Sequence, residues 1–365
     1  MVQGTVVNAS GKKIGLALGG LGGSNAHGVG VLQAMRTLGL RPQVLSCTSG
    51  MIEWAARWLK GDDLRTELEA SIKAARAFPP TMPVANWLKI VTQGLPGVFR
   101  PALQEYWQRW AQPFDPRDTK AWADRVAPAQ TWVPLRTDAA FADIADTFNR
   151  ADDIAIFFNS FDPDDGYEIV HANPAGWAYL RTLWQARGLS GEGQEGVRVE
   201  PERAGPHGPR VVYESITAES VRDALWLNAY GFGPSEAPRQ RIDGAYVRQF
   251  ILSEMVDADI LFIARPQAYA WLGRAPQNYT EIQDFQTELW FNAAYGQQIH
   301  SIEMVNAWIK DGKLKDNGYN QVRLEPIEIA VQRSYFEYFV EDIAVYDHAY
   351  DTARKHIEKV LNDES

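Results

Sequence analysis

The order of elements in the first sixty residues is the feature that most limits how this chain can fold. A short apolar strand, IGLAL, occupies 14–18, and the glycine-rich loop GGLGGSNAHG follows it at 19–28. A helical pattern at 29–40 and a second strand at 42–47 come next, and a second helix begins directly after Ser49. This order predicts an α/β fold with a mostly parallel central sheet flanked by helices.

The rest of the chain extends this sheet and interrupts it once. Residues 62–150 are helical, aromatic and broken by prolines, so we expect a helical insertion or cap there. The segment 188–210 is rich in Gly, Pro and charge and predicts a surface loop. We expect a single domain over 1–345 and a charged helical tail over 346–365. Further strands are expected at 154–162, 166–172, 258–266 and 322–330, a turn at 241–247, and helices at 216–229 and 279–310.

The charge of the chain limits its partners. It carries 36 Lys and Arg against 46 Asp and Glu, a formal net charge of −10. Binding to nucleic acid requires a basic face, so nucleic acid is not expected as a partner. The same balance disfavours electrostatic docking on an anionic membrane. It leaves room for a lipid or other ester that enters an apolar cleft, with transient contact to a lipid surface.

Cysteine usage and short motifs point to a cytoplasmic protein without a metal or cofactor. Cys47 is the single cysteine, so the chain cannot form an internal disulfide. The first residues lack the apolar core of a secretory signal, and no window approaches the ~20 apolar residues of a membrane span. There is no CxxC or HExxH, and the histidines are scattered. The oligomeric state is left open by the sequence.

The glycine loop has several readings. A dinucleotide-binding turn needs a third glycine where Asn25 stands and an acid after the second strand, and a phosphate-binding P-loop needs GK followed by Ser or Thr. Backbone N–H groups of such a turn at a helix N-terminus can instead form an oxyanion hole. A tight turn between strand and helix with no catalytic role stays open beside these.

Ser49 also has two readings. It sits in CTSGM at 47–51, between a strand and a helix, where a nucleophile elbow of the GxSxG type places its serine. A serine at this position can equally be an N-cap. A nucleophilic serine needs a base, and the more suggestive partner is Asp243 in IDGA, although DG is also common in turns. A histidine could also serve as the base, but none lies in a motif that indicates this role. The six histidines are His27, His171, His207, His300, His348 and His356.

Together these elements resemble the patatin-like phospholipases, which combine a glycine-rich oxyanion loop, a GxSxG elbow and a later DGG or DGA motif. The loop matches at GGLGG (19–23), the elbow at CTSGM (47–51) and the last motif at DGA (243–245). The similarity covers most of 14–310, without the helical insertion and the 188–210 loop. The elbow departs from the family at Cys47 and Met51, where the two framing glycines are replaced.

The resemblance implies a three-layer hydrolase fold and a serine acyl hydrolase that cleaves carboxylic esters of lipids. It implies Ser49 as nucleophile and Asp243 as base, without a cofactor or metal. It assigns the oxyanion hole to Gly20, Leu21, Gly22 and Gly23. Two alternatives stay open: the same dyad acting on a polyester, thioester or small ester, and a non-catalytic relative that binds. Candidates for an acyl pocket, or equally for the core, are Trp54, Trp58, Trp87 and Trp226.

Overall fold

The computed structural model describes 11–20, 25–75, 94–95, 97–126, 128–187, 210–233, 239–272, 275–277, 279–314, 318–329 and 342–363. Its centre is one sheet with the strand order β10-β9-β1-β2-β5-β6-β7, and β8 pairs with β5 off this path. The strands are β1 Ile14–Leu18, β2 Val44–Cys47, β5 Ala155–Asp162, β6 Tyr167–Ala172, β7 Arg210–Ser215, β8 Ile242–Asp243, β9 Ile260–Arg265 and β10 Arg323–Glu328.

Most of the neighbouring strands run parallel, as the sequence predicts. The pairs β1–β2, β1–β9, β9–β10, β2–β5 and β6–β7 are parallel. The pairs β5–β6 and β5–β8 are antiparallel, and the first of them is the hairpin expected from 154–172. Every residue of β1, β2 and β9 is buried. Strands buried on both faces read as continuous apolar runs, which is why IGLAL could be recognised.

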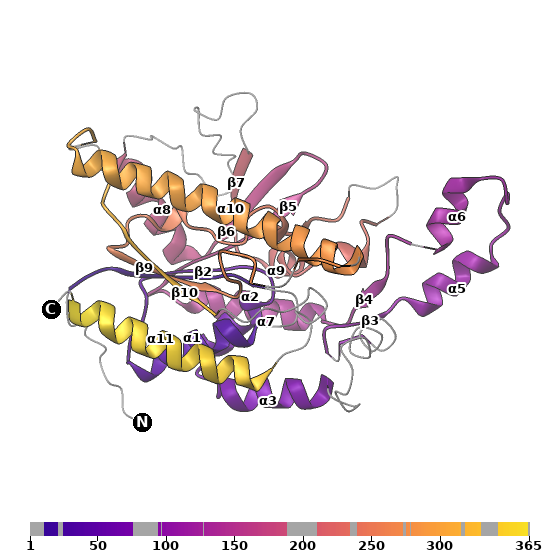
Figure 1. Ribbon diagram of the computed structural model, residues 1–365, viewed down its shortest axis with the longest axis horizontal. Coiled ribbons are helices and arrows are strands. Elements are labelled where there is room, and N and C mark those ends of the chain that lie inside the picture. Colours follow the sequence, from indigo (N-terminus) through magenta and orange to yellow (C-terminus); the bar gives the residue numbers. More distant parts are fainter. Residues whose placement is uncertain are drawn as a thin grey trace.

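Helices cover both faces of the sheet, which gives three layers (Figure 1). Alternate residues of β1 and β9 enter two separate apolar clusters, one on each face. The first cluster is covered by α1 Ala26–Thr37, α2 Met51–Lys60, α3 Leu64–Ala75, α7 Asp138–Arg150, α9 Ala218–Ala224 and α11 Ile343–Asp363. The second is covered by α8 Pro174–Ala186 and α10 Tyr279–Lys310.

Part of the predicted insertion projects from the body as an arm (Figure 1). The arm consists of β3 Phe99–Pro101, α5 Leu103–Ala111, α6 Thr119–Val126 and β4 Trp132–Pro134, and β3 pairs antiparallel with β4. No residue of α5 is buried, and Trp107 and Trp122 are exposed. The helices α3 and α7 at either end of 62–150 pack on the main core instead. The projecting arm, Phe99–Pro134, is therefore shorter than the insertion that the sequence predicts over 62–150.

The C-terminal helix is part of the core, although its charge pattern predicts a tail. Six residues of α11, among them Ala349 and Ile357, belong to the apolar cluster on that face. The helix lies along α1 at Gly30, where a Cβ would come within 2.6 Å of the Tyr346 carbonyl oxygen. A small residue on α1 lets the two helix backbones approach closely.

Two features of the strand pattern differ from the sequence prediction. The strand β7 was not expected, and the turn at 241–247 contains the short strand β8 followed by a 3-10 helix, Gly244–Tyr246. Of the predicted loop at 188–210, residues 188–209 lie outside the described part of the chain. None of the described helices has the length and apolar character needed to span a membrane.

The contact at Gly30 can be tested by adding one methyl group. We expect Gly30→Ala to lower the free energy of unfolding by about 1–3 kcal/mol, because the new Cβ meets fixed backbone of α11. Gly296→Ala on α10 is the matched control, since its Cβ would meet only the Tyr269 side chain, at 3.3 Å. Denaturant unfolding of both variants measures the difference, and equal losses would contradict the close approach of α1 and α11.

Candidate active site

Ser49 lies on a strained corner between β2 and α2. Among the residues that the structure describes, it is the one non-glycine residue with a positive φ, +52°. Helix α2 begins after Gly50, whose φ is −54°, and no side chain caps it. The N-cap role left open by the sequence is therefore not the role of the Ser49 side chain. Non-glycine residues in the left-handed region are uncommon and often mark functional corners.

Small residues on neighbouring elements make room for this corner. A Cβ on Gly20 would lie 2.2 Å from the Thr48 carbonyl oxygen and 2.8 Å from Ser49 Cβ. A Cβ on Gly28 of α1 would lie 2.4 Å from the sulfur of Met51. Gly28 thus accommodates the methionine that stands where the elbow motif has glycine. The departure at Met51 is matched by a space on the adjacent helix.

Thr48 connects the corner to two distant segments. Its Oγ1 accepts a hydrogen bond from the Gly20 N–H at 3.1 Å and donates one to the Gln249 carbonyl at 2.8 Å. The Gln249 side-chain amide donates back to the Gly20 carbonyl at 3.1 Å. The Gly20 N–H is thus engaged in fixing the corner, and a direct role in an oxyanion hole requires this bond to change. The other predicted members, Leu21, Gly22 and Gly23, lie outside the described residues.

Asp243 is fixed by a tight turn against β5. It ends β8, where it pairs with Ser160, and its N–H donates to the Trp226 carbonyl at 2.9 Å. Its carboxylate accepts a hydrogen bond from the Ala245 N–H at 2.9 Å. A Cβ on Gly244 would lie 2.4 Å from the Asn159 side chain, so glycine is required beside the aspartate.

The structure brings Asp243 and Ser49 together. Asp243 is 2% exposed, and burial raises the pKa of its carboxyl from 3.8 to about 7. Hydrogen bonding from the Ser49 side chain and from the Ala245 N–H opposes the rise. A carboxyl group with this pKa can hold or release a proton near neutral pH.

A buried cation fixes the loop that follows Asp243. The Arg248 guanidinium pairs with Glu168 at 2.8 Å and with Glu254 at 2.9 Å. Asn159 donates to Glu168 at 2.7 Å and to the Arg248 carbonyl at 3.0 Å. These charges lie close to the turn, yet no cation is among the causes that set the pKa of Asp243. These ion pairs hold the loop, and no cation of the described residues acts as a counter-charge to Asp243.

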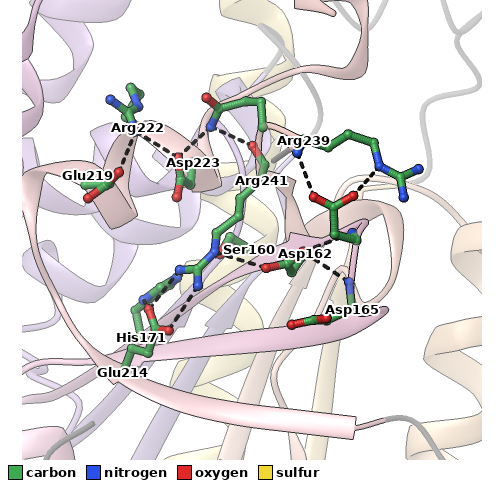
Figure 2. A network of polar contacts seen from close by, with 12 residues as sticks. Ser160, Asp162, Asp165, His171, Glu214, Glu219, Arg222, Asp223, Arg239 and Arg241 are labelled. Carbon is green, nitrogen blue, oxygen red and sulfur yellow. Dashed lines mark hydrogen bonds and ion pairs between the residues drawn. The ribbon is translucent and has the colours of Figure 1, made fainter. Parts of the chain in front are cut away.

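A second serine, Ser160, lies in a polar network on β5, the strand that pairs with β8 (Figure 2). The Ser160 hydroxyl and His171 Nε2 are 2.8 Å apart, and His171 Nδ1 is 4.0 Å from Glu214, which pairs with Arg241. Burial, and to a smaller extent Arg241, lowers the pKa of His171 to about 3. Ser160 and His171 are fully buried and do not line the recess described below.

A recess opens beside Ser49. The recess is small: its cavity volume is about 10 Å³, and the wider empty space of about 270 Å³ around it includes open solvent. The base of the arm supplies one wall and the segment after α9 supplies the other. The lining residues are Ser49, Gly50, Val98, Phe99, Arg136, Leu225, Leu227 and Tyr230.

The tryptophans proposed for an acyl pocket lie in different parts of the structure. Trp54 and Trp58 are buried in the main core cluster. Trp226 belongs to a small apolar cluster around Phe99 and Tyr230, which line the recess. Trp87 lies outside the described residues.

The sequence analysis missed several residues around Ser49. Thr48 and Gln249 hold the corner, and Arg136 and Tyr230 line the recess. Their proximity depends on contacts across the fold, and no motif surrounds them. The Gly50 N–H, which follows the serine at the start of α2, has no acceptor among the described residues. An elbow motif itself signals this N–H, because it faces the site beside the nucleophile. No metal-ligand cluster of His, Cys, Asp or Glu occurs in the described ranges.

Comparison with known proteins gives a structural neighbour without an assignment. No protein-family model matches the chain, and no curated protein matches its sequence. Among solved structures, the chain is similar to human GIVD cytosolic phospholipase A2, with 13% sequence identity and a TM-score of 0.36. The match covers 100% of this chain and 64% of that chain, so this chain spans less than two thirds of the neighbour's length. Similarity at this level assigns no activity, and function has to be argued from the residues around Ser49.

The raised pKa of Asp243 has a consequence for stability. The unfolded chain ionises this carboxyl near pH 3.8, whereas the folded protein keeps it protonated up to about pH 7. The folded state therefore loses stability as pH rises from 4 to 7, by an amount on the order of 2–4 kcal/mol. Asp243→Asn removes this loss and should raise the free energy of unfolding at pH 8 more than at pH 5.

Denaturant unfolding at the two pH values measures the effect. Asp152→Asn is the control, because it makes the same chemical change at an exposed position. An Asp243→Asn variant that is no more stable than the parent at pH 8 would contradict the buried, uncompensated carboxylate.

Proposed function

We propose that this protein is a serine acyl hydrolase that cleaves carboxylic esters with an apolar acyl chain, as in lipids. The observation that carries the proposal is the meeting of the strained Ser49 with Asp243, whose pKa is about 7, beside a recess. Apolar side chains such as Phe99 and Leu227 line part of the recess and are compatible with an acyl chain.

In the proposed mechanism, the ionised Asp243 carboxylate takes the proton of Ser49 while Ser49 Oγ attacks the ester carbonyl carbon. The carbonyl oxygen becomes an oxyanion, and its proposed donors are the N–H groups of Gly50 and of the 20–23 loop, where the Gly20 N–H must first leave Thr48 Oγ1. Each well-aimed donor lowers the barrier by ~3–4 kcal/mol. Asp243 returns the proton to the departing alcohol, and an acyl-enzyme remains on Ser49. Water, activated by the same carboxylate, then releases the acid.

Exposed apolar side chains on the arm favour a lipid over a small ester. Leu103 and Trp107 of α5 and Trp122 and Val126 of α6 are each at least 41% exposed. The arm continues from Val98 and Phe99 of the recess. Large exposed apolar side chains rimmed by polar ones are typical of surfaces that contact other molecules or lipid. Hydrolysis of a polyester, thioester or small ester by the same pair is the alternative, and acyl-chain profiling separates them.

Removal of the nucleophile is the direct test of hydrolysis. We expect Ser49→Ala to lower kcat/KM on p-nitrophenyl octanoate at least about 10³-fold, because no other group forms the acyl-enzyme. Ser301→Ala, which removes an exposed hydroxyl from α10, should leave the rate unchanged. A fluorophosphonate should label Ser49 in the parent protein, with mass spectrometry locating the adduct. Full activity in Ser49→Ala, or folded protein that resists the label, would favour a non-catalytic binding protein.

The pH dependence of the rate tests the base. Asp243 has to be ionised to accept the proton of Ser49, so kcat/KM should fall about tenfold per pH unit below pH 7. The rate should level off above that pH. Initial rates between pH 5 and 8.5, corrected with the Ser49→Ala variant, measure this limb. A limb centred near pH 4, as for an exposed aspartate, would argue against Asp243 as the base.

A further inference from the structure

Tyr230 lines the recess and carries a buried hydroxyl group that has no partner among the described residues. It ends the 3-10 helix Asn228–Tyr230, is 4% exposed and lines the recess together with Ser49. Its hydroxyl makes no hydrogen bond with the described residues. Most buried hydroxyl groups have a partner, and leaving one without a partner destabilises the folded state. A ligand in the recess is the partner that this group can acquire.

The aromatic ring of Tyr230 is held firmly. It packs edge-on against Trp226, with ring centroids 5.4 Å apart. Its ring centroid lies 6.3 Å from that of Phe99. The Trp226 indole N–H donates to the Gly231 carbonyl at 2.8 Å, and the Thr131 N–H donates to the Ala229 carbonyl at 2.9 Å. The hydroxyl is therefore positioned before any ligand arrives, which is the condition for effective electrostatic stabilisation.

The surroundings of Tyr230 keep its hydroxyl protonated. Burial raises the pKa of Tyr230 to about 12, with Arg136 lowering it and Asp243 raising it. At neutral pH the group is thus a hydrogen-bond donor. The Asp243 carboxylate is near enough to contribute to this rise in the pKa of Tyr230.

The described residues offer few other donors to an oxygen bound at Ser49. The Gly20 N–H is bonded to Thr48, and the Arg136 side chain is bonded to Glu53 through both Nε and Nη2. Arg136 Nη1, the Gly50 N–H and the Tyr230 hydroxyl remain as candidate donors: Gly50 precedes the start of α2, and Arg136 and Tyr230 line the recess.

We propose that the Tyr230 hydroxyl donates a hydrogen bond to the acyl oxygen of a ligand bound in the recess. The inference deepens the proposed function and rests on it. As Ser49 Oγ bonds to the carbonyl carbon, the carbonyl π electrons move to the oxygen, and the Ser49 proton goes to Asp243. Tyr230 keeps its own proton and strengthens its hydrogen bond to the oxyanion. When the leaving C–O bond breaks, the oxygen becomes a carbonyl again.

The test is removal of the hydroxyl alone. Tyr230→Phe should lower kcat on p-nitrophenyl octanoate about 10²-fold with little change in KM, because the bond strengthens in the transition state. Its melting temperature should be equal to or above that of the parent, since the lost group has no partner in the protein. Tyr179→Phe is the control, because it removes a hydroxyl outside the recess that accepts from the Asp257 N–H. Its kcat should match the parent.

A binding measurement separates the failure of this inference from the failure of the proposed function. Octanamide, an uncharged acyl ligand, is titrated into Ser49→Ala and Ser49→Ala/Tyr230→Phe, with tryptophan fluorescence as the readout. Loss of the hydroxyl should weaken binding about fivefold or more. Ser49-dependent turnover with an unchanged kcat in Tyr230→Phe would overturn the role of Tyr230 and leave the proposed function standing.

The opposite result is equally informative. If the parent protein shows no Ser49-dependent turnover, the proposed function fails, and octanamide decides on Tyr230. Weaker binding after loss of the hydroxyl would then support its role as a donor to an acyl oxygen. Equal affinities, or no binding to either variant, would overturn it.

Discussion

The hydrogen bonds around Thr48 hold the candidate site in place. One hydroxyl has a single proton and two lone pairs, and here it donates to the Gln249 carbonyl while accepting from the Gly20 N–H. Three segments that are distant in the sequence therefore meet beside Ser49. The Gln249 amide bond to the Gly20 carbonyl closes the ring. A residue with φ of +52° persists only where its surroundings fix it, and this ring together with the first turn of α2 does so.

The buried carboxylates around the site differ in their pairing with cations, and this difference affects the pKa of Asp243. Arg248 compensates two buried carboxylates, Glu168 and Glu254, within a few residues of Asp243. Asp243 itself receives hydrogen bonds but no cation, so burial dominates its pKa. A neighbouring guanidinium would hold the carboxylate ionised at any ordinary pH and make it a weak base. The loop is thus stabilised by an ion network, while burial keeps the pKa of the aspartate at about 7, as the proposed role of a base requires.

Local patterns in the sequence predicted the strands of the sheet but not the residues that surround Ser49. IGLAL and the buried strands could be predicted because strands covered on both faces are uniformly apolar. The proximity of Ser49 and Asp243 was predicted from a family resemblance, and the structure brings the two together. The core position of α11 could not be predicted, since its charged face dominates the pattern and its packing depends on Gly30 of α1. Tyr230 was missed for a related reason, because its importance lies in a hydroxyl left without a partner.

The network in Figure 2 shows why residue types alone do not define a catalytic site. Ser160, His171 and Glu214 follow the order of a Ser–His–acid triad, and Ser160 pairs with Asp243 across β5 and β8. The imidazole, however, has a pKa of about 3 and is a poor proton acceptor at neutral pH. Ser160 is fully buried and does not line the recess, whereas Ser49 lines it. Ser160 is therefore best explained as a structural residue, whereas the recess beside Ser49 is what the proposed hydrolase function requires.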